Sequence, residues 1–144
     1  MKISIVPANQ ASGFVRTIHE SANMSSPILL GGTRWDCVEE AVLAMINGKT
    51  VGIATIAPQG EENSGQPTIV AIYVLPEHRH NQLGYKLLEA AVDQMIAKNL
   101  VPIRLDVLNS KVMKMINRLP EEKRNQLKIH NCSGGNFLDK ILDL

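Results

Sequence analysis

The junction at residues 73–88, "YVLPEHRHNQLGYKLL", constrains the fold more than any other part of the sequence. It ends a near-continuous apolar run, residues 68–76, of the kind that forms a central β-strand buried on both faces. After a polar loop, an apolar period near 3.6 predicts a helix from Gly84 to Asn99. A buried strand that leads directly into such a helix requires a layered architecture, in which helices cover a sheet.

A second signal precedes this junction, where Asn47-Gly48 separates two apolar runs at residues 39–46 and 49–57. Asn-Gly supplies the two positive φ angles of a tight hairpin turn, so the runs are predicted to be antiparallel neighbours. Further strands are expected at 2–6, 101–108 and 127–132, and loops at 24–34 and 58–67. A helix capped by Asn9 should run to about Ala22, and further helices are expected at 110–119 and, as a short one, at 134–144. Residues 120–126 should form a polar turn or helical stub. The order β-α-β-β-β-α-β-α-β, without a repeat or a linker, indicates one mixed α/β (α+β) domain over residues 1–144.

Composition argues against several classes of function. The chain has 144 residues with 44% hydrophobic content, enough to bury a core, and a formal net charge of +1. That charge would attract neither nucleic acid nor an anionic membrane, and an aromatic content of 3% is too low for base-stacking platforms. No run of about 18 apolar residues predicts a membrane span. Two distant cysteines and an N-terminus unlike a signal peptide lead us to expect a cytoplasmic protein.

A resemblance to a known family lies in residues 72–92, "IYVLPEHRHNQLGYKLLEAAV". This stretch resembles the acetyl-CoA-binding motif of the GNAT superfamily of N-acetyltransferases, in which a strand ending in Val-x-Pro precedes Gln/Arg-x-x-Gly-x-Gly/Ala at the start of a helix. Arg79 matches the first position of the second pattern and Gly84 the last, whereas Gln82 stands where the first glycine is usual. The hairpin resembles the two strands before the motif, so the likeness extends from about Glu40 to Leu119.

The resemblance implies a central, mostly antiparallel, twisted sheet flanked by helices, and acetyl-CoA as a cosubstrate without a metal. The pyrophosphate of coenzyme A would lie against backbone N–H groups at the helix start, where the helix dipole favours anions. Its pantetheine arm would pair with residues 72–74, which requires that neighbouring strands splay apart. The residues expected to contact coenzyme A are Ile72, Tyr73, Val74, Arg79, His80, Gln82, Leu83, Gly84, Tyr85 and Asn109. The expected partners are coenzyme A and a small-molecule or protein amine, with a homodimer left open.

Catalytic residues are harder to assign. The family commonly places a Glu on the central strand as the general base, but residues 68–75 contain no Glu. It commonly supplies the general acid as the Tyr of an Asn-x-x-Ala-x-x-x-Tyr pattern. Here Asn109 is kept, but Val112 stands at the Ala position, Ile116 at the Tyr position and Pro120 where a Gly usually follows. Two functions therefore stay open. One is an N-acetyltransferase that works by proximity, with water or an unassigned side chain moving the protons. The other is a non-catalytic domain that binds coenzyme A or a protein partner.

Other polar side chains allow two interpretations. His78 and His80 could ligate a metal, but no third ligand has a suitable spacing, so a solvated loop explains them better. One basic helical face is formed by Lys111, Lys114 and Arg118. This face is either solvated or directed at the 3′-phosphate of coenzyme A. Structural rather than chemical roles are expected for Cys37, Cys132 and His130.

Overall fold

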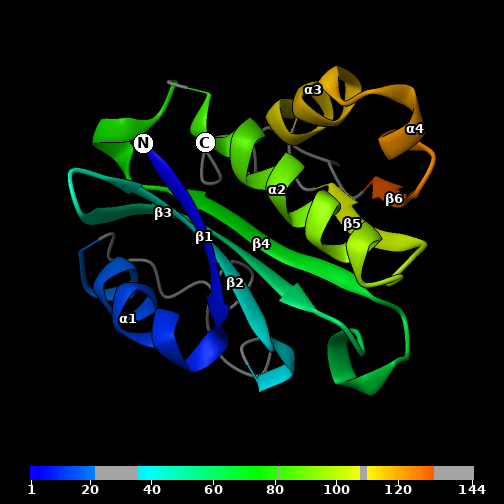
Figure 1. The fold of residues 1–144 in the computed structure, drawn as a ribbon, viewed down its shortest axis with the longest axis horizontal. Helices are drawn as coiled ribbons and strands as arrows, with labels where there is room; N and C mark the ends of the chain where they lie inside the picture. Colours follow the sequence, from blue (N-terminus) through cyan, green and yellow to red (C-terminus); the bar gives the residue numbers. More distant parts are fainter. Residues whose placement is uncertain (22–35, 81, 108–109, 132–144) are drawn as a thin grey trace.

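The structure, a computed structural model, describes residues 1–21, 36–80, 82–107 and 110–131 (Figure 1). One sheet contains six strands in chain order: β1 (Lys2–Pro7), β2 (Glu40–Ile46), β3 (Lys49–Ala57), β4 (Thr68–Val74), β5 (Ile103–Val107) and β6 (Leu127–Asn131). The α-helices are α1 (Ser12–Ser21), α2 (Leu83–Ala97), α3 (Ser110–Arg118) and α4 (Glu121–Arg124). Single 3₁₀ turns are η1 (Ala8–Ala11), η3 (Glu61–Asn63) and η4 (Pro76–His78).

The sheet is mixed. Strands β1 to β4 pair antiparallel, whereas β4–β5 and β5–β6 are parallel. Parallel neighbours need a crossover, and α2 provides the one between β4 and β5, while α3 and α4 lie between β5 and β6. The predicted fold class, a mostly antiparallel sheet flanked by helices, is therefore confirmed.

The hairpin between β2 and β3 forms at the predicted turn. Asn47 has φ 52° and Gly48 has φ 77°, the left-handed pair that a two-residue hairpin turn requires. Ile46 and Lys49 pair across it. A local pattern of two residues was enough to predict this part of the sheet.

The first helix begins later than predicted. Asn9 does not cap an α-helix, because Ala8–Ala11 forms a 3₁₀ turn and α1 starts at Ser12. The Ala8 N–H, at the start of this turn, donates to Glu39 O (3.0 Å), which ties the turn to the segment just before β2. The predicted end of this helix at Ala22 and the predicted helix at 134–144 lie outside the described residues.

Strands β2 and β3 are buried on both faces. Every residue from Val51 to Ala57 in β3 is buried, as is the Ala41–Ala44 stretch of β2. Figure 1 shows α1 and α2 on opposite sides of these strands, which accounts for the double burial. Helix α2 approaches most closely at Gly52, where an added Cβ would lie 2.9 Å from Leu87 Cδ1. The face that carries Gly52 and its cross-strand partner Val74 is therefore the α2 face.

Candidate functional site

Strands β4 and β5 separate soon after they meet. Their pairing covers only Thr68 with Arg104 and Ile69 with Leu105. On the other side of β4, the register with β3 shifts so that Val70 is an additional residue, a β-bulge. A bulge increases local twist, which turns the rest of β4 away from β5. The splay that the sequence interpretation required is present, and it leaves one edge of β4 open beyond Val70.

Backbone groups of Ile72 and Val74 point toward this open edge. Leu75 N–H donates to Val51 O (2.9 Å), so the N–H of Leu75 faces β3. Backbone direction alternates along a strand, and therefore Tyr73 also faces β3 while Ile72 and Val74 face the gap. A strand-like ligand in the gap could pair with these two residues.

Helix α2 starts just beyond this edge without a side-chain cap. Its N-cap residue, Gln82, has φ 64° and ψ 13°, and its side chain makes no capping hydrogen bond. The first N–H groups of an α-helix have no acceptor within the helix, and here the bond from Lys86 N–H to Gln82 O (3.1 Å) is the first one between described residues. The N–H groups of Leu83, Gly84 and Tyr85 are consequently directed out of the helix start.

The loop before α2 is strained on both sides of position 81. His80 has φ 68°, and Gln82 is also in the left-handed region that favours glycine. Non-glycine residues in this conformation cost about 1–3 kcal/mol each and concentrate at ligand-binding loops. This strain is a physical sign of a binding loop that does not depend on the sequence motif.

A cavity of about 190 Å³ lies at the start of α2. It is lined by His80, Gln82, Gly84, Tyr85, Lys111, Met115 and Arg118. Four of the residues predicted to contact coenzyme A thus lie in one cavity with Lys111 and Arg118 of the predicted basic helical face. The third residue of that face, Lys114, is exposed and is not part of the lining. The cavity combines outward N–H groups with positive side chains, which suits an anion.

Arg118 connects α3 to this helix start. Its Nη2 donates to Gln82 Oε1 (2.7 Å), and its guanidinium lies 4.3 Å from the centre of the Tyr85 ring. The Tyr85 hydroxyl donates to Glu89 Oε2 (3.3 Å), and desolvation, followed by the Glu89 charge, raises the pKa of Tyr85. These contacts hold one wall of the cavity in place.

Lys123 ties α4 to the same helix. Its Nζ lies 2.9 Å from Asp93 Oδ1 and 3.3 Å from Glu89 Oε2. The hydrogen bond that Lys123 donates to Asp93 raises the pKa of Lys123 despite some opposing desolvation. Ion pairs therefore fix α2 relative to α4, and the Arg118 contacts fix it relative to α3.

Arg79 is placed differently from the other predicted contacts. Its Nε donates to Val74 O (2.9 Å), and its guanidinium lies 5.2 Å from the centre of the Tyr73 ring. The side chain therefore lies along the end of β4 rather than in the cavity at the α2 start.

A second cavity, of about 500 Å³, lies on the α1 face of the sheet. Its lining comprises Phe14, Thr17, Lys49, Thr50, Tyr73, Leu75, Pro76 and Glu77. The Tyr73 side chain points into this face because it alternates with Ile72 and Val74 along β4. Sequence reasoning missed Phe14 and Glu77 as cavity residues. Two sequence features could have indicated these residues: the helical period that includes Phe14, and the position of Glu77 directly after Pro76 at the end of the apolar run.

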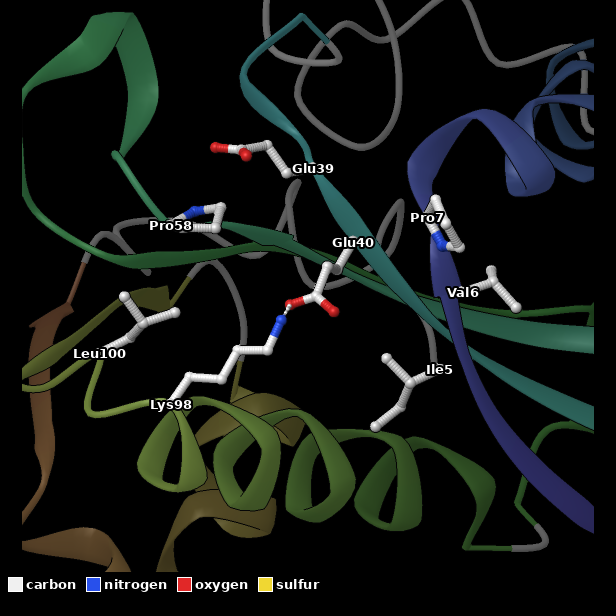
Figure 2. A pocket seen from close by; sticks show the side chains of 8 residues that line it. All are labelled: Ile5, Val6, Pro7, Glu39, Glu40, Pro58, Lys98 and Leu100. Atoms are coloured by element: carbon white, nitrogen blue, oxygen red, sulfur yellow. Dashed lines mark hydrogen bonds and ion pairs between the residues drawn. The ribbon is translucent and has the colours of Figure 1, made fainter.

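A third cavity, of about 580 Å³, lies at the opposite end of α2 (Figure 2). Lys98 Nζ reaches across it to Glu40 Oε1 (2.8 Å), as Figure 2 shows, and Gln94 Nε2 donates to Glu40 Oε2 (3.2 Å). A helix of this length is about 20 Å long, so this cavity is remote from the helix start. The Glu40 carboxylate in this cavity is already paired, and we assign that residue to structure.

The expected acid position holds no polar group. Ile116 is 1% exposed and belongs to the hydrophobic core, and Val112 packs against that core. Asn109 and Cys132 lie outside the described residues. Among the residues that the structure describes, no three His, Cys, Asp or Glu side chains come together as a metal site would require. No helix in those ranges is both long and apolar enough to cross a bilayer.

Comparison with known proteins agrees with this geometry. The sequence profile of the acetyltransferase (GNAT) family matches residues 16–118. The chain belongs to the GNAT acetyltransferase family. No curated protein sequence gives a significant match to this GNAT chain.

Solved structures show the same GNAT fold at low sequence identity. A ribosomal-protein-alanine N-acetyltransferase from Brucella melitensis biovar Abortus 2308 has a TM-score of 0.53 at 20% identity, over 87% of each chain. An aminoglycoside acetyltransferase from an uncultured soil metagenomic sample has a TM-score of 0.52 at 19% identity, over 72% of this chain and 75% of that one. The N-acetylglutamate synthase of Neisseria gonorrhoeae, complexed with coenzyme A and N-acetyl-glutamate, has a TM-score of 0.51 at 16% identity. That match covers 87% of this chain but 32% of the synthase.

Proposed function

We propose that this GNAT protein transfers an acetyl group from acetyl-CoA to an amine. The observation that carries the proposal is the open edge of β4, which leads directly to the uncapped start of α2. An extended amide-containing arm can pair with such an edge, and a pyrophosphate fits an uncapped helix start. Coenzyme A contains both groups, joined in that order. A structural relative in complex with coenzyme A supports the choice of this donor.

Each part of the donor has residues suited to it. The N–H groups of Leu83, Gly84 and Tyr85 would hold the pyrophosphate, with Lys111 and Arg118 adding positive charge from α3. Backbone groups of Ile72 and Val74 would pair with the pantetheine arm, which directs the thioester toward the bulge at Val70. The acceptor would approach from the α1 face, where the second cavity lies.

In the reaction, the amine nitrogen forms a bond to the thioester carbonyl carbon, and the carbon–sulfur bond then breaks. An N–H at the open edge of β4 would stabilise the negative charge that develops on the carbonyl oxygen. The amine must lose a proton, and the departing thiolate must gain one. Water would take the first proton, because Glu77, on η4 beyond the α2 end of β4, lies at the opposite end of the open edge from the bulge at Val70. Ile116 has no proton to give, so the thiolate would be protonated by water.

A thiol-release assay with a panel of primary amines tests the proposal, with intact-mass detection of acetylated products. We expect release of coenzyme A that depends on both substrates, and a mass increase of one acetyl group on the acceptor. The buried Ile116 favours the second candidate, a GNAT domain that binds coenzyme A without turnover. Binding of acetyl-CoA by calorimetry, without thiol release from any amine, would select that candidate. Absence of binding at high micromolar protein would reject both.

A further inference from the structure

The open edge of β4 is occupied by a side chain of this chain itself. Arg79 Nε donates to Val74 O at 2.9 Å, so it takes one of the carbonyl groups that a strand-like ligand would need. Tyr73 supports the guanidinium through a cation–π contact of 5.2 Å. The hydrogen bond is partly buried, which makes it stronger than a surface contact. Arg79 and an incoming amide arm therefore compete for the same acceptor.

The acceptor of Arg79 lies under the first turns of α2. Val74 Cγ2 and Leu87 Cδ1 both lie within 4 Å of the same point, the position of a Cβ on Gly52 (3.5 and 2.9 Å). Arg79 precedes the first residue of α2 by only four positions, and the strained residues His80 and Gln82 form the connection. The guanidinium itself lies against Tyr73 at the end of β4, outside the cavity at the helix start, and only three residues of chain separate Arg79 from α2.

We propose that Arg79 is a specificity-determining residue that covers the edge of β4 until an anion at the start of α2 draws its guanidinium away. This inference rests on the proposed function. A guanidinium binds phosphate oxygens more strongly than a neutral carbonyl, because the bond is charge-assisted and can be bidentate. Once it moves, Val74 O becomes available to the ligand. Donors that carry a pyrophosphate uncover their own binding edge, whereas acyl-pantetheine thioesters without phosphate do not.

Thermodynamic linkage makes the proposal measurable. If an anion at the helix start uncovers the edge, it must raise the affinity for an amide arm there, and the arm must raise the affinity for the anion by the same factor. The two halves of the donor can be supplied separately, as inorganic pyrophosphate and pantetheine. Coupling of about fivefold or more is expected for a side chain that changes partner.

The experiment measures Kd by calorimetry for coenzyme A, for pantetheine, and for pantetheine in saturating pyrophosphate. Three proteins are compared: the parent, Arg79→Met and Arg16→Met, the last removing an exposed arginine from α1. In the parent and in Arg16→Met, pyrophosphate should tighten pantetheine binding about fivefold or more. Arg79→Met should bind pantetheine about fivefold more tightly than the parent and show no effect of pyrophosphate. Arg79→Lys, which keeps the charge but lacks the planar fork, serves as a second variant and should show reduced coupling.

The outcomes separate this inference from the proposed function. Undiminished pyrophosphate coupling in Arg79→Met would overturn the inference. So would weaker binding of coenzyme A by that variant with unchanged pantetheine binding, because Arg79 would then be a phosphate ligand only. In both cases donor binding and the proposed function stand. A folded parent protein that binds neither coenzyme A nor pantetheine would overturn both.

Discussion

Gln82 Oε1 accepts a hydrogen bond from Arg118 Nη2 at 2.7 Å, which joins the first residue before α2 to the last residue of α3. Gln82 makes this contact from a left-handed backbone conformation, φ 64°, at the position where the family pattern has a glycine. The side-chain contact and the backbone strain thus act in opposite directions on stability.

Gln82→Gly should separate these two effects. Glycine relieves the left-handed strain, about 1 kcal/mol or more, and frees Arg118 for a phosphate. We expect coenzyme A affinity equal to or higher than that of the parent, measured by calorimetry. The matched control is Gln82→Ala, which also loses the Arg118 contact but keeps the strain. Equal thermal stability of the two variants would show that the left-handed conformation costs nothing.

Gly84→Asp should weaken coenzyme A binding, and because Gly84 is buried it should also lower the free energy of unfolding. A carboxylate in the first turn of a helix is favourable for the helix, but it would occupy the N–H groups and repel a pyrophosphate. At the distance of a direct contact this repulsion should cost at least about tenfold in Kd. Gly13→Asp is the control, because Gly13 also lies in a first helical turn and an added Cβ there would meet nothing within 4 Å. Parent-like binding by folded Gly84→Asp would place the pyrophosphate elsewhere.

Ile116→Tyr tests whether an acid can be restored at the family position. Because Ile116 is buried in the core, the phenol should overpack it and cost about 1–3 kcal/mol, with no gain in thiol release. A melting curve and the thiol-release assay give both readouts. Ile116→Leu, nearly equal in volume, should cost less than about 1.5 kcal/mol. Faster thiol release from the tyrosine variant would show that this helix face borders the thioester.

Gly52→Ala should destabilise the fold, because the new Cβ meets the buried Leu87 side chain at 2.9 Å and Tyr73 O at 3.3 Å. We expect a loss of about 1–3 kcal/mol in the free energy of unfolding, measured in urea. The same substitution at Gly13, in open space on α1, should instead stabilise by up to about 1 kcal/mol through helix propensity. Effects of the same sign at both positions would contradict the close packing of α2 on β3.

The ion pairs of Lys123 lead us to expect a change in stability at alkaline pH. Its pKa is raised in the folded protein, chiefly by Asp93, so its contribution is complete below the ordinary lysine value of 10.5 and is lost as pH rises through the raised value. Lys123→Met should therefore lower Tm by about 2–4 °C at pH 8, and the difference from the parent should shrink above pH 10.5. Lys128→Met removes the same charge from β6 and controls for net charge. A difference that stays constant with pH would contradict the ion-pair assignment.

Local signals predicted most of the fold. The Asn47-Gly48 turn, the apolar period of α2 and the buried run of β4 each specify their structure within a few residues, and all three are confirmed. The start of α1 was predicted wrongly: Ala8–Ala11 forms a 3₁₀ turn, whose first N–H bonds to Glu39, a residue distant in sequence. Capping propensity does not include such a contact.

The candidate site was predictable only in part, for the same reason. The helix start at Gly84 follows from the motif, but the bulge at Val70 depends on how β4 pairs with β3. The orientation of Arg79 depends on a carbonyl that the departure of β5 leaves available. Single-sequence patterns assign residue types to positions, whereas these features arise from contacts between separate strands.

The order of strands in the sheet has a consequence for how the chain acquires its structure. Each strand pairs with the one that follows it in sequence, from β1 through β6. Pairing between sequence neighbours keeps contact order low, and low contact order speeds folding because short loops close at little entropic cost. As the chain leaves the ribosome, β2 and β3 can form their hairpin before the α2 segment has been made, and each later strand then adds to an existing edge. The proposed donor site lies between β4 and β5, so it would form, and bind a ligand, only after β5 has been made late in synthesis.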